Sequence, residues 1–298
     1  MGKINIVFLG TGSAIPTITR NHSAIFFRYK EKNILIDCGE GTQRQIRKAK
    51  INPCKITDIL ITHFHGDHFF GLPGLLSTLS KSGYNKTLNI YGPKNSKKIF
   101  NKIFEIANVN LDIKFKEVSG KFIDTPYFSI TAMPLEHKIN CNGYLFQEKD
   151  RLRINKKKLA KLKLKKEDLK KLNLLVQKKN IKLNGKSIKY KEMTYPVVGR
   201  KVSFIFDTKT CTNALKLAKN CDLSIIESSF LEQTPLAKEY KHMTLEDTLK
   251  IAKKAKVKKL ILTHISQRYE HKENFYLKKA KKKFKNLELA KDLMKIEI

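Results

Sequence analysis

The chain has 298 residues, of which 41% are hydrophobic and 30% charged, enough apolar content to bury a core. This composition excludes collagen, a coiled coil and global disorder. The five cysteines are scattered and form no CxxC pair, which excludes a disulfide scaffold and favours reduced thiols in the cytoplasm. Lys and Arg number 61 against 27 Asp and Glu, a formal net charge of +34. Part of this excess is expected from compositional bias, but the charge favours a polyanionic partner, nucleic acid first and an anionic membrane surface second.

The predicted elements alternate between apolar strands and amphipathic helices, as expected for α/β layers. In chain order they are strands over 4–9, 24–29, 33–37 and 57–62, a helix over 71–81, a strand over 88–91, a helix over about 94–107, strands over 111–118, 128–134, 143–148, 201–206 and 223–227, a helix over 244–255, a strand over 258–263 and a helix near 274–284. Thr244 with Asp247 three residues later predicts a capping box.

The similar segments ILITH (59–63) and LILTH (260–264) suggest two related halves. No apolar run approaches the ~20 residues of a membrane span, and no signal peptide is expected.

The segment 151–196 differs from the rest of the chain. It contains 17 Lys and Arg but only 3 Asp and Glu. The spacing of Leu159, Leu162, Leu169 and Leu172 is compatible with a short helix, but the segment holds little that could form a core of its own. We therefore expect one domain over 1–298 with a basic arm inserted at 151–196. The alternative interpretation of this segment is a solvated, partly disordered loop.

The strongest chemical signal is the hexapeptide His63-Phe64-His65-Gly66-Asp67-His68, directly after a predicted strand. His63 and His65 are two residues apart, so in extended chain they point the same way and can bind one ion. Asp67 and His68 follow at a turn into a helix, which directs them toward a second position. Nitrogen and oxygen ligands of this kind suit a dinuclear zinc site.

This hexapeptide resembles the HxHxDH signature of the metallo-β-lactamase superfamily, an αββα sandwich with two similar halves. The resemblance implies three further ligands, each after a predicted strand: His137, Asp207 and His264. It further implies that His63, His65 and His137 bind one metal, that Asp67, His68 and His264 bind the other, and that Asp207 bridges the two. Two zinc ions held in this way are suited to hydrolysis of a phosphodiester.

Within that superfamily the chain resembles the tRNase Z family most. The similar segments are FLGTGSAIPTITRNHSA at the N-terminus, ILIDCGEGTQRQI, HMTLEDT around His242, and LTHISQRY at 262–269. The arm at 151–196 lies where this family inserts a tRNA-binding exosite, although the Gly-Pro pair usual there is absent. The resemblance implies a homodimeric endoribonuclease that cuts precursor tRNA after the discriminator nucleotide, leaving a 3′-hydroxyl on the tRNA and a 5′-phosphate on the trailer.

Further residue roles follow from the matching motifs. His242 is the candidate proton donor to the leaving oxygen, Glu227 the group that orients it, and Asp67 a ligand that also accepts the proton of the attacking water. Four residues are candidate substrate contacts: Ser266, Arg268, Arg20 and Asn21.

Two alternatives remain open at the level of the sequence. The first is a phosphodiesterase or sulfatase of the same fold that acts on a small ester and does not need the basic arm. The second is an RNA-binding protein without turnover, which would not need the ordered ligand set. Turnover of a small ester compared with precursor tRNA, together with metal analysis, distinguishes these alternatives.

Overall fold

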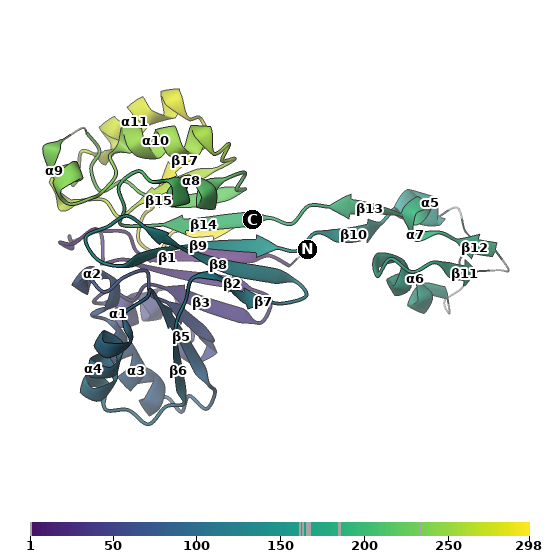
Figure 1. Ribbon diagram of the computed structural model, residues 1–298, viewed down its shortest axis with the longest axis horizontal. Coiled ribbons are helices and arrows are strands. Elements are labelled where there is room, and N and C mark those ends of the chain that lie inside the picture. Colours follow the sequence, from purple (N-terminus) through teal and green to yellow (C-terminus); the bar gives the residue numbers. More distant parts are fainter. Residues whose placement is uncertain (1, 161, 163, 165–167, 184–185, 233) are drawn as a thin grey trace.

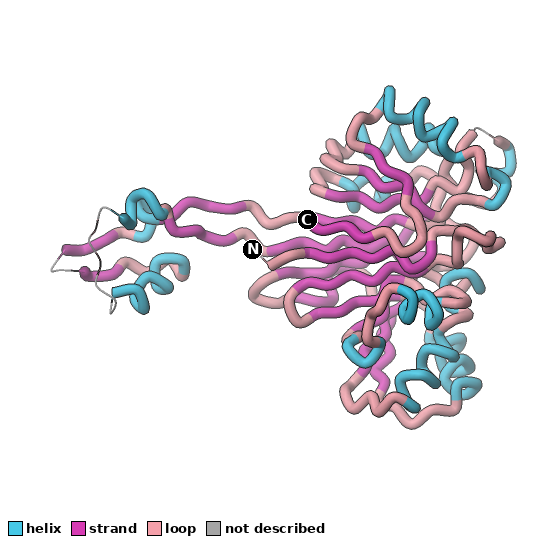
Figure 2. Tube along the Cα trace, turned by 180° about the vertical axis from the view of Figure 1, so that it is seen from behind, coloured by secondary structure: helices cyan, strands magenta, loops and turns pink. Residues whose placement is uncertain are grey.

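The computed structural model describes residues 2–160, 162, 164, 168–183, 186–232 and 234–298. Two seven-stranded sheets lie face to face, helices cover their outer faces, and a long arm projects from one end (Figure 1 and Figure 2). The predicted αββα arrangement is confirmed. Among the described residues, no helix is long and apolar enough to cross a membrane.

The first sheet has the strand order β18-β1-β2-β3-β4-β5-β6. Its strands are β1 (Ile4–Gly10), β2 (Ala24–Tyr29), β3 (Lys32–Ile36), β4 (Asp58–Leu60), β5 (Leu88–Gly92), β6 (Ile113–Glu117) and β18 (Lys295–Glu297). From β18 to β3 neighbouring strands are antiparallel, and from β3 to β6 they are parallel.

The second sheet has the strand order β17-β16-β15-β14-β9-β8-β7. Its strands are β7 (Gly120–Asp124), β8 (Phe128–Leu135), β9 (Cys141–Glu148), β14 (Lys201–Ile205), β15 (Leu223–Glu227), β16 (Leu260–Thr263) and β17 (Leu287–Leu289). From β7 through β8 and β9 to β14, neighbouring strands are antiparallel. From β14 through β15 and β16 to β17, they are parallel. Both sheets thus have the same pattern of pairing, which agrees with two related halves. The sequence analysis missed β7 because its five residues carry two charges and a glycine.

Helices cover both outer faces of this sandwich. Over the first sheet lie α1 (Thr42–Lys48), α3 (Leu72–Lys81) and α4 (Lys97–Ala107); over the second lie α8 (Thr212–Ala218), α10 (Leu245–Lys254) and α11 (Glu273–Lys283). Shorter turns are α2 (Gly66–Phe69), α9 (Pro235–Glu239), and the 3₁₀ helices Pro53–Lys55 and Gln267–Tyr269. The capping box at the start of α10 is confirmed: the backbone N–H of Asp247 donates to the Thr244 hydroxyl, and that of Thr244 to the Asp247 carboxylate.

The core between the sheets is rich in aromatic side chains. Phe146 packs against Phe27 and Tyr29 of the opposite sheet, with ring centroids 4.8 and 5.1 Å apart. Since the central strands are buried on both faces, their sequences are almost continuous apolar runs, and this made them recognisable from the sequence.

The arm leaves the sandwich between β9 and β14 (Figure 1). Its two-stranded stalk is β10 (Arg151–Ile154) paired with β13 (Thr194–Val197), and beyond it lie α5 (Lys156–Ala160), α6 (Asp168–Val176), the hairpin β11 (Ile181–Leu183) and β12 (Lys186–Ile188), and α7 (Tyr190–Met193).

The prediction that the arm holds too little to form a core is wrong. Leu175, Ile181 and Met193 come from three different elements and are buried in one small apolar cluster. The expected single helix is also wrong, because Leu159 lies on α5 while Leu169 and Leu172 lie on α6. Parts of that prediction, at residues 161, 163 and 165–167, lie outside the described residues.

Candidate metal centre

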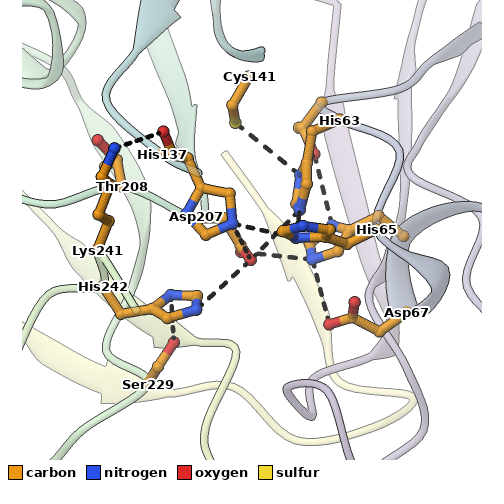
Figure 3. A network of polar contacts seen from close by, with 12 residues as sticks. His63, His65, Asp67, His137, Cys141, Asp207, Thr208, Ser229, Lys241 and His242 are labelled. Atoms are coloured by element: carbon orange, nitrogen blue, oxygen red, sulfur yellow. Dashed lines mark hydrogen bonds and ion pairs between the residues drawn. The ribbon is translucent and has the colours of Figure 1, made fainter. Parts of the chain in front are cut away.

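The predicted ligands all follow strands that end at the same end of the sandwich. β4 leads into the HFHGDH segment, and β8, β14 and β16 end shortly before His137, Asp207 and His264. Gly66 begins α2, so the chain turns there from extended to helical, which points Asp67 and His68 differently from the two preceding histidines. Figure 3 shows the side chains of five of them converging on one another: His63, His65, Asp67, His137 and Asp207.

The first group brings together His63, His65, His137 and Asp207. Nδ1 of His65 lies 3.0 Å from Nε2 of His63 and 3.1 Å from Nε2 of His137. Oδ2 of Asp207 lies 3.5 Å from Nε2 of His63 and 3.8 Å from Nε2 of His137. Four donor atoms therefore face a common centre.

The second group brings together Asp67, His68, His264 and the same Asp207. The Nε2 atoms of His68 and His264 are 3.1 Å apart, and Oδ2 of Asp67 lies 3.2 Å from the latter. Oδ1 of Asp207 lies 3.3 Å from each of these nitrogens. Asp207 thus presents one oxygen to each group, the arrangement of a bridging carboxylate.

The donor set fits two metal ions. With metal–nitrogen distances of about 2.0–2.1 Å, the ligand atoms of a tetrahedral zinc site are about 3.3 Å apart. The spacings of 3.0–3.8 Å within the first group lie around this value. Neutral imidazole nitrogen and carboxylate oxygen are ligands that zinc accepts.

At His63, His137 and the two aspartates the electrostatics favour the protonation states that bind metal. Burial lowers the pKa of His63 well below its usual range and that of His137 to about 4, so these imidazoles are neutral. Burial opposes ionisation of Asp67 and Asp207, yet the surrounding histidines hold the pKa of both carboxyls far below the usual range. His68 differs: burial lowers its pKa, but the carboxylates of Asp207, Asp67 and Asp37 raise it well above the usual range.

His242 lies beside the cluster and outside both groups of four. Its Nδ1 lies 3.1 Å from both carboxylate oxygens of Glu227, and its Nε2 points toward Asp207, 3.9 Å from Oδ2. Burial disfavours the imidazolium, but the carboxylates of Glu227 and Asp207 raise the pKa of His242 to about 9. The geometry therefore holds one nitrogen of the ring and leaves the other facing the cluster.

Of the two candidate substrate contacts after His264, only Arg268 is exposed. Ser266 is buried, its hydroxyl donates to the Gln267 side chain at 2.9 Å, and it accepts the backbone N–H of Arg268 at 3.4 Å. Ser266 thus starts the short turn that carries Arg268, whose guanidinium lies 5.8 Å from the ring of Phe230. That ring in turn lies 6.3 Å from the ring of His242.

Arg20 and Asn21 have partners inside the protein. Arg20 is only 7% exposed, and its guanidinium donates to Thr11, to the carbonyl of Ala290 and to Glu273. The side chain of Asn21 donates to the carbonyl of Glu40 at 2.6 Å. The bonds to Ala290 and Glu273 join the first loop of the chain to its C-terminal part, so the guanidinium of Arg20 is occupied within the protein.

The cluster lies at the floor of a cleft of about 610 Å³. His65, Asp67, His137, Asp207, His242 and His264 all contribute to its lining. Around them the wall contains Glu40, Phe70, Lys138 and Tyr240.

Comparison with known proteins identifies the family. The chain is 38% identical to the ribonuclease Z of Nanoarchaeum equitans over 89% of its own length and 84% of that protein. It is 36% identical to the ribonuclease Z of Methanosarcina mazei, covering 99% of this chain and 98% of that one. The chain belongs to the ribonuclease Z family. A model of the family described as Anti-Pycsar protein Apyc1 also matches residues 4–287, so the chain falls within that family too.

Solved structures agree with this assignment. The human tRNase Z short form, ELAC1, superimposes with a TM-score of 0.69 and 27% identity over 98% of both chains. The metallo-β-lactamase fold protein YhfI from Bacillus subtilis has a TM-score of 0.71 at 18% identity over the full length of both chains. The metallo-β-lactamase fold implied by the sequence is therefore confirmed.

Two residues that support the site of this ribonuclease Z family member were not predicted. Asp37 contacts Nδ1 of His68, and the hydroxyl of Ser229 donates to Glu227 at 2.5 Å and lies 2.9 Å from Nδ1 of His264. Both follow buried strands, as the ligands do, and this position was the available signal. A single Asp or Ser after a strand is also what an ordinary turn contains, so the pattern did not distinguish them.

Proposed function

We propose that this protein is a metal-dependent endoribonuclease that removes the 3′ trailer from precursor tRNA. It cuts after the discriminator nucleotide and leaves a 3′-hydroxyl on the tRNA and a 5′-phosphate on the trailer. The observation that carries this proposal is the two-group ligand cluster with the His242–Glu227 pair beside it, in a chain that matches ribonucleases Z over almost its whole length.

Two zinc ions are the proposed cofactor of each subunit. His63, His65 and His137 would hold one ion and Asp67, His68 and His264 the other, with the Asp207 carboxylate shared between them. Bound there, the ions would supply stabilisation of the charge that develops on the phosphate oxygens and would lower the pKa of water.

The protein's own groups handle the protons. Asp67 lines the cleft, and its carboxylate accepts the proton of the attacking water. His242 gives a proton from Nε2 to the departing 3′ oxygen. Glu227 accepts the hydrogen bond from Nδ1 of His242, which fixes the ring and stabilises its protonated form.

Arg268 is the proposed phosphate contact near the cleft. Its exposed guanidinium offers paired N–H donors that match two phosphate oxygens. Ser266 contributes by starting the turn that carries Arg268.

The basic arm is the proposed site for the tRNA body. β14 begins at the root of the arm and ends just before Asp207, so the arm leaves the end of the sandwich opposite the cleft (Figure 1). An arm in this position favours a homodimer, in which the arm of one subunit holds the tRNA whose 3′ end is cut by the other. The cytoplasm is the proposed location, since all five thiols are free.

The test is incubation with a 3′-extended precursor tRNA, with and without a chelator, and mapping of the cut to one nucleotide. The proposal expects a single chelator-sensitive cut after the discriminator nucleotide. Tight binding without a cut, in protein shown to contain two metal ions, contradicts it. Turnover of a small phosphodiester without cleavage of tRNA would instead support the small-ester alternative.

A further inference from the structure

Two exposed aromatic rings stand on the wall of the cleft and are not needed for the core. Phe70 is 63% exposed and Tyr240 is 40% exposed, and both line the cleft together with the metal-binding cluster. Phe70 follows α2 and Tyr240 follows α9, and Figure 1 shows these two helices on opposite sides of the same end of the sandwich. The rings therefore flank the cleft from its two halves.

The ring of Phe70 lies against Gly66, the glycine of the HFHGDH segment. A Cβ atom added at Gly66 would lie 2.3 Å from Cε2 of the Phe70 ring. The absence of a side chain at Gly66 thus lets the ring lie against the loop that carries Asp67. The centroid of Phe69 is 4.8 Å away, so the ring is packed along one side while most of its surface faces solvent.

Tyr240 is fixed from the opposite side. It ends α9, where its backbone N–H donates to the carbonyl of Leu236. The ammonium of Lys138 lies 4.5 Å from the centroid of its ring, and Lys241 donates to the backbone carbonyl of His137 at 3.3 Å. These contacts join the Tyr240 loop to the segment that carries His137, so this ring also has a defined position beside the cluster.

We propose that Tyr240 and Phe70 are stacking subsites for the two nucleotides that flank the scissile phosphate. The inference rests on the proposed function and deepens it. His242 gives its proton to the 3′ oxygen of the discriminator nucleotide, so that nucleotide lies on the His242 side of the cleft, where Tyr240 is two residues away in the chain. The first trailer nucleotide then lies on the other side, against Phe70.

The chemistry of the two walls fits single-stranded RNA. Bases of unpaired RNA are recognised by stacking on aromatic rings, and stacking tolerates any base because every base has a π face. Lys138, which lines the cleft beside Tyr240, adds a positive charge for the backbone phosphate.

The test combines substitutions in the metal-loaded enzyme with changes in the substrate, so that each variant is measured on each substrate. Three precursor tRNAs are compared: one intact, one abasic at the discriminator position and one abasic at the first trailer position. For each, kcat/KM is measured with wild type, Phe70→Ala and Tyr240→Ala. Phe275→Ala is the matched control, since Phe275 is 69% exposed but lies on α11, outside the lining of the cleft.

On the intact substrate, each cleft variant is expected to lose ~5- to 150-fold in kcat/KM, the effect of removing one stacked base. Phe70→Ala should lose little further on the substrate abasic at the first trailer position and keep its full loss on the other. Tyr240→Ala should show the reverse. Phe70→Tyr and Tyr240→Phe keep an aromatic ring and should stay within ~3-fold of wild type.

Metal content and thermal unfolding of each variant show whether it is folded, and Phe70→Leu keeps apolar packing while losing the stacking face. Equal losses on all three substrates, or no loss on the intact one, overturn the proposal. A reversed dependence on the two abasic positions overturns the assignment of each ring. Failure of the wild type to cut intact precursor is a different result, because it contradicts the proposed function itself.

Discussion

Oδ2 of Asp37 lies 2.7 Å from Nδ1 of His68, and both side chains are completely buried. The backbone N–H of Thr62 donates to the same carboxylate at 2.7 Å, which holds it in place. With Nδ1 occupied, only Nε2 of His68 faces the second group of ligands. Asp37 therefore decides which nitrogen of His68 is available to a metal.

Replacing Asp37 by Asn should weaken binding of one metal ion about 10- to 100-fold, because a partner of this kind fixes the ligand and increases its basicity. The measurement is titration with a competing chelator, followed by metal analysis. Asp58→Asn is the matched control: Asp58 is equally buried but bonds Lys32, so its loss should lower stability and leave metal affinity unchanged. Equal metal affinity in Asp37→Asn and wild type would contradict this role.

Asp67→Ala should abolish cleavage of precursor tRNA while leaving tRNA binding mostly intact. Asp67 is a proposed metal ligand and proton acceptor, whereas the arm is the proposed source of most phosphate contacts. Cleavage assays and electrophoretic binding assays on the same preparation check this. Loss of binding in proportion to loss of cleavage would show that Asp67 instead maintains the binding surface.

His242→Ala should lower kcat on precursor tRNA ~10²- to 10⁴-fold, the usual contribution of a general acid. A substrate with sulfur in place of the 3′ oxygen at the scissile bond needs no proton for departure, so its cleavage should fall much less. Glu227→Gln should give a smaller loss of the same kind, since the carboxylate acts through His242. If the sulfur and oxygen substrates lose equally, His242 is not the proton donor.

The alternation of apolar strands and amphipathic helices predicted α/β layers, and the HFHGDH segment after a strand predicted a metal site. The αββα sandwich and the ligands His137, Asp207 and His264 were expected from the resemblance to the metallo-β-lactamase superfamily. Asp207 and His264 have positive φ angles of 27° and 58°, which the sequence did not indicate and which turn their side chains toward the cluster. Such backbone conformations depend on the assembled sheet, since few residues other than glycine adopt them in isolation.

The arm was harder to predict for a physical reason. Its small core draws single apolar residues from short elements separated by lysines, so no stretch shows a clear period. Arg20 was difficult to place for a different reason, because its residue type did not indicate which groups surround it. Its charge suggested a phosphate contact, but in the structure Thr11, Ala290 and Glu273 accept its N–H groups.

Removing residues 151–196 and joining Asp150 to Val197 through Asn-Gly should weaken binding of precursor tRNA while sparing hydrolysis of a small phosphodiester. Arg151 is paired with Val197 across the stalk, so Asp150, the residue before it, lies close enough to Val197 for a two-residue turn to span the gap. Because the removed lysines bind phosphate by charge, the slope of log binding constant against log salt should also become shallower.

A single substitution distinguishes the contribution of the arm's folded structure to tRNA binding from the contribution of its charge. Leu175→Ala leaves every lysine in place but opens the apolar cluster of the arm, where Leu175 is fully buried. Faster proteolysis within the arm and weaker tRNA binding are expected, with small-ester turnover unchanged. Unchanged tRNA binding after the deletion would show that the arm is not the tRNA site.

The root of the arm contains a buried ion pair. Nε and Nη2 of Arg200 donate to the two carboxylate oxygens of Glu148 at 2.8 and 2.7 Å, joining the end of β9 to the start of β14. Burial opposes ionisation of Glu148, but the hydrogen bonds from Arg200 lower its pKa to about 2. The ionised form is therefore stabilised by folding.

This shift fixes the sign and the range of a pH effect on stability. The folded pKa lies below the unfolded value of 4.5, so the contribution is complete above that pH and is lost as the pH falls toward 2. A shift of this size corresponds to at most roughly 3 kcal/mol, and solvent near the root of the arm reduces it. Denaturant unfolding of the chelator-treated protein should therefore show Glu148→Gln less stable than wild type at pH 6, with the difference shrinking as the pH falls from 4.5 to 2. Glu297→Gln, at the exposed pair with Lys3, should show almost no difference across the same range. A gap between Glu148→Gln and wild type that stays constant with pH would mean that the side chain stabilises the root by packing rather than by its charge.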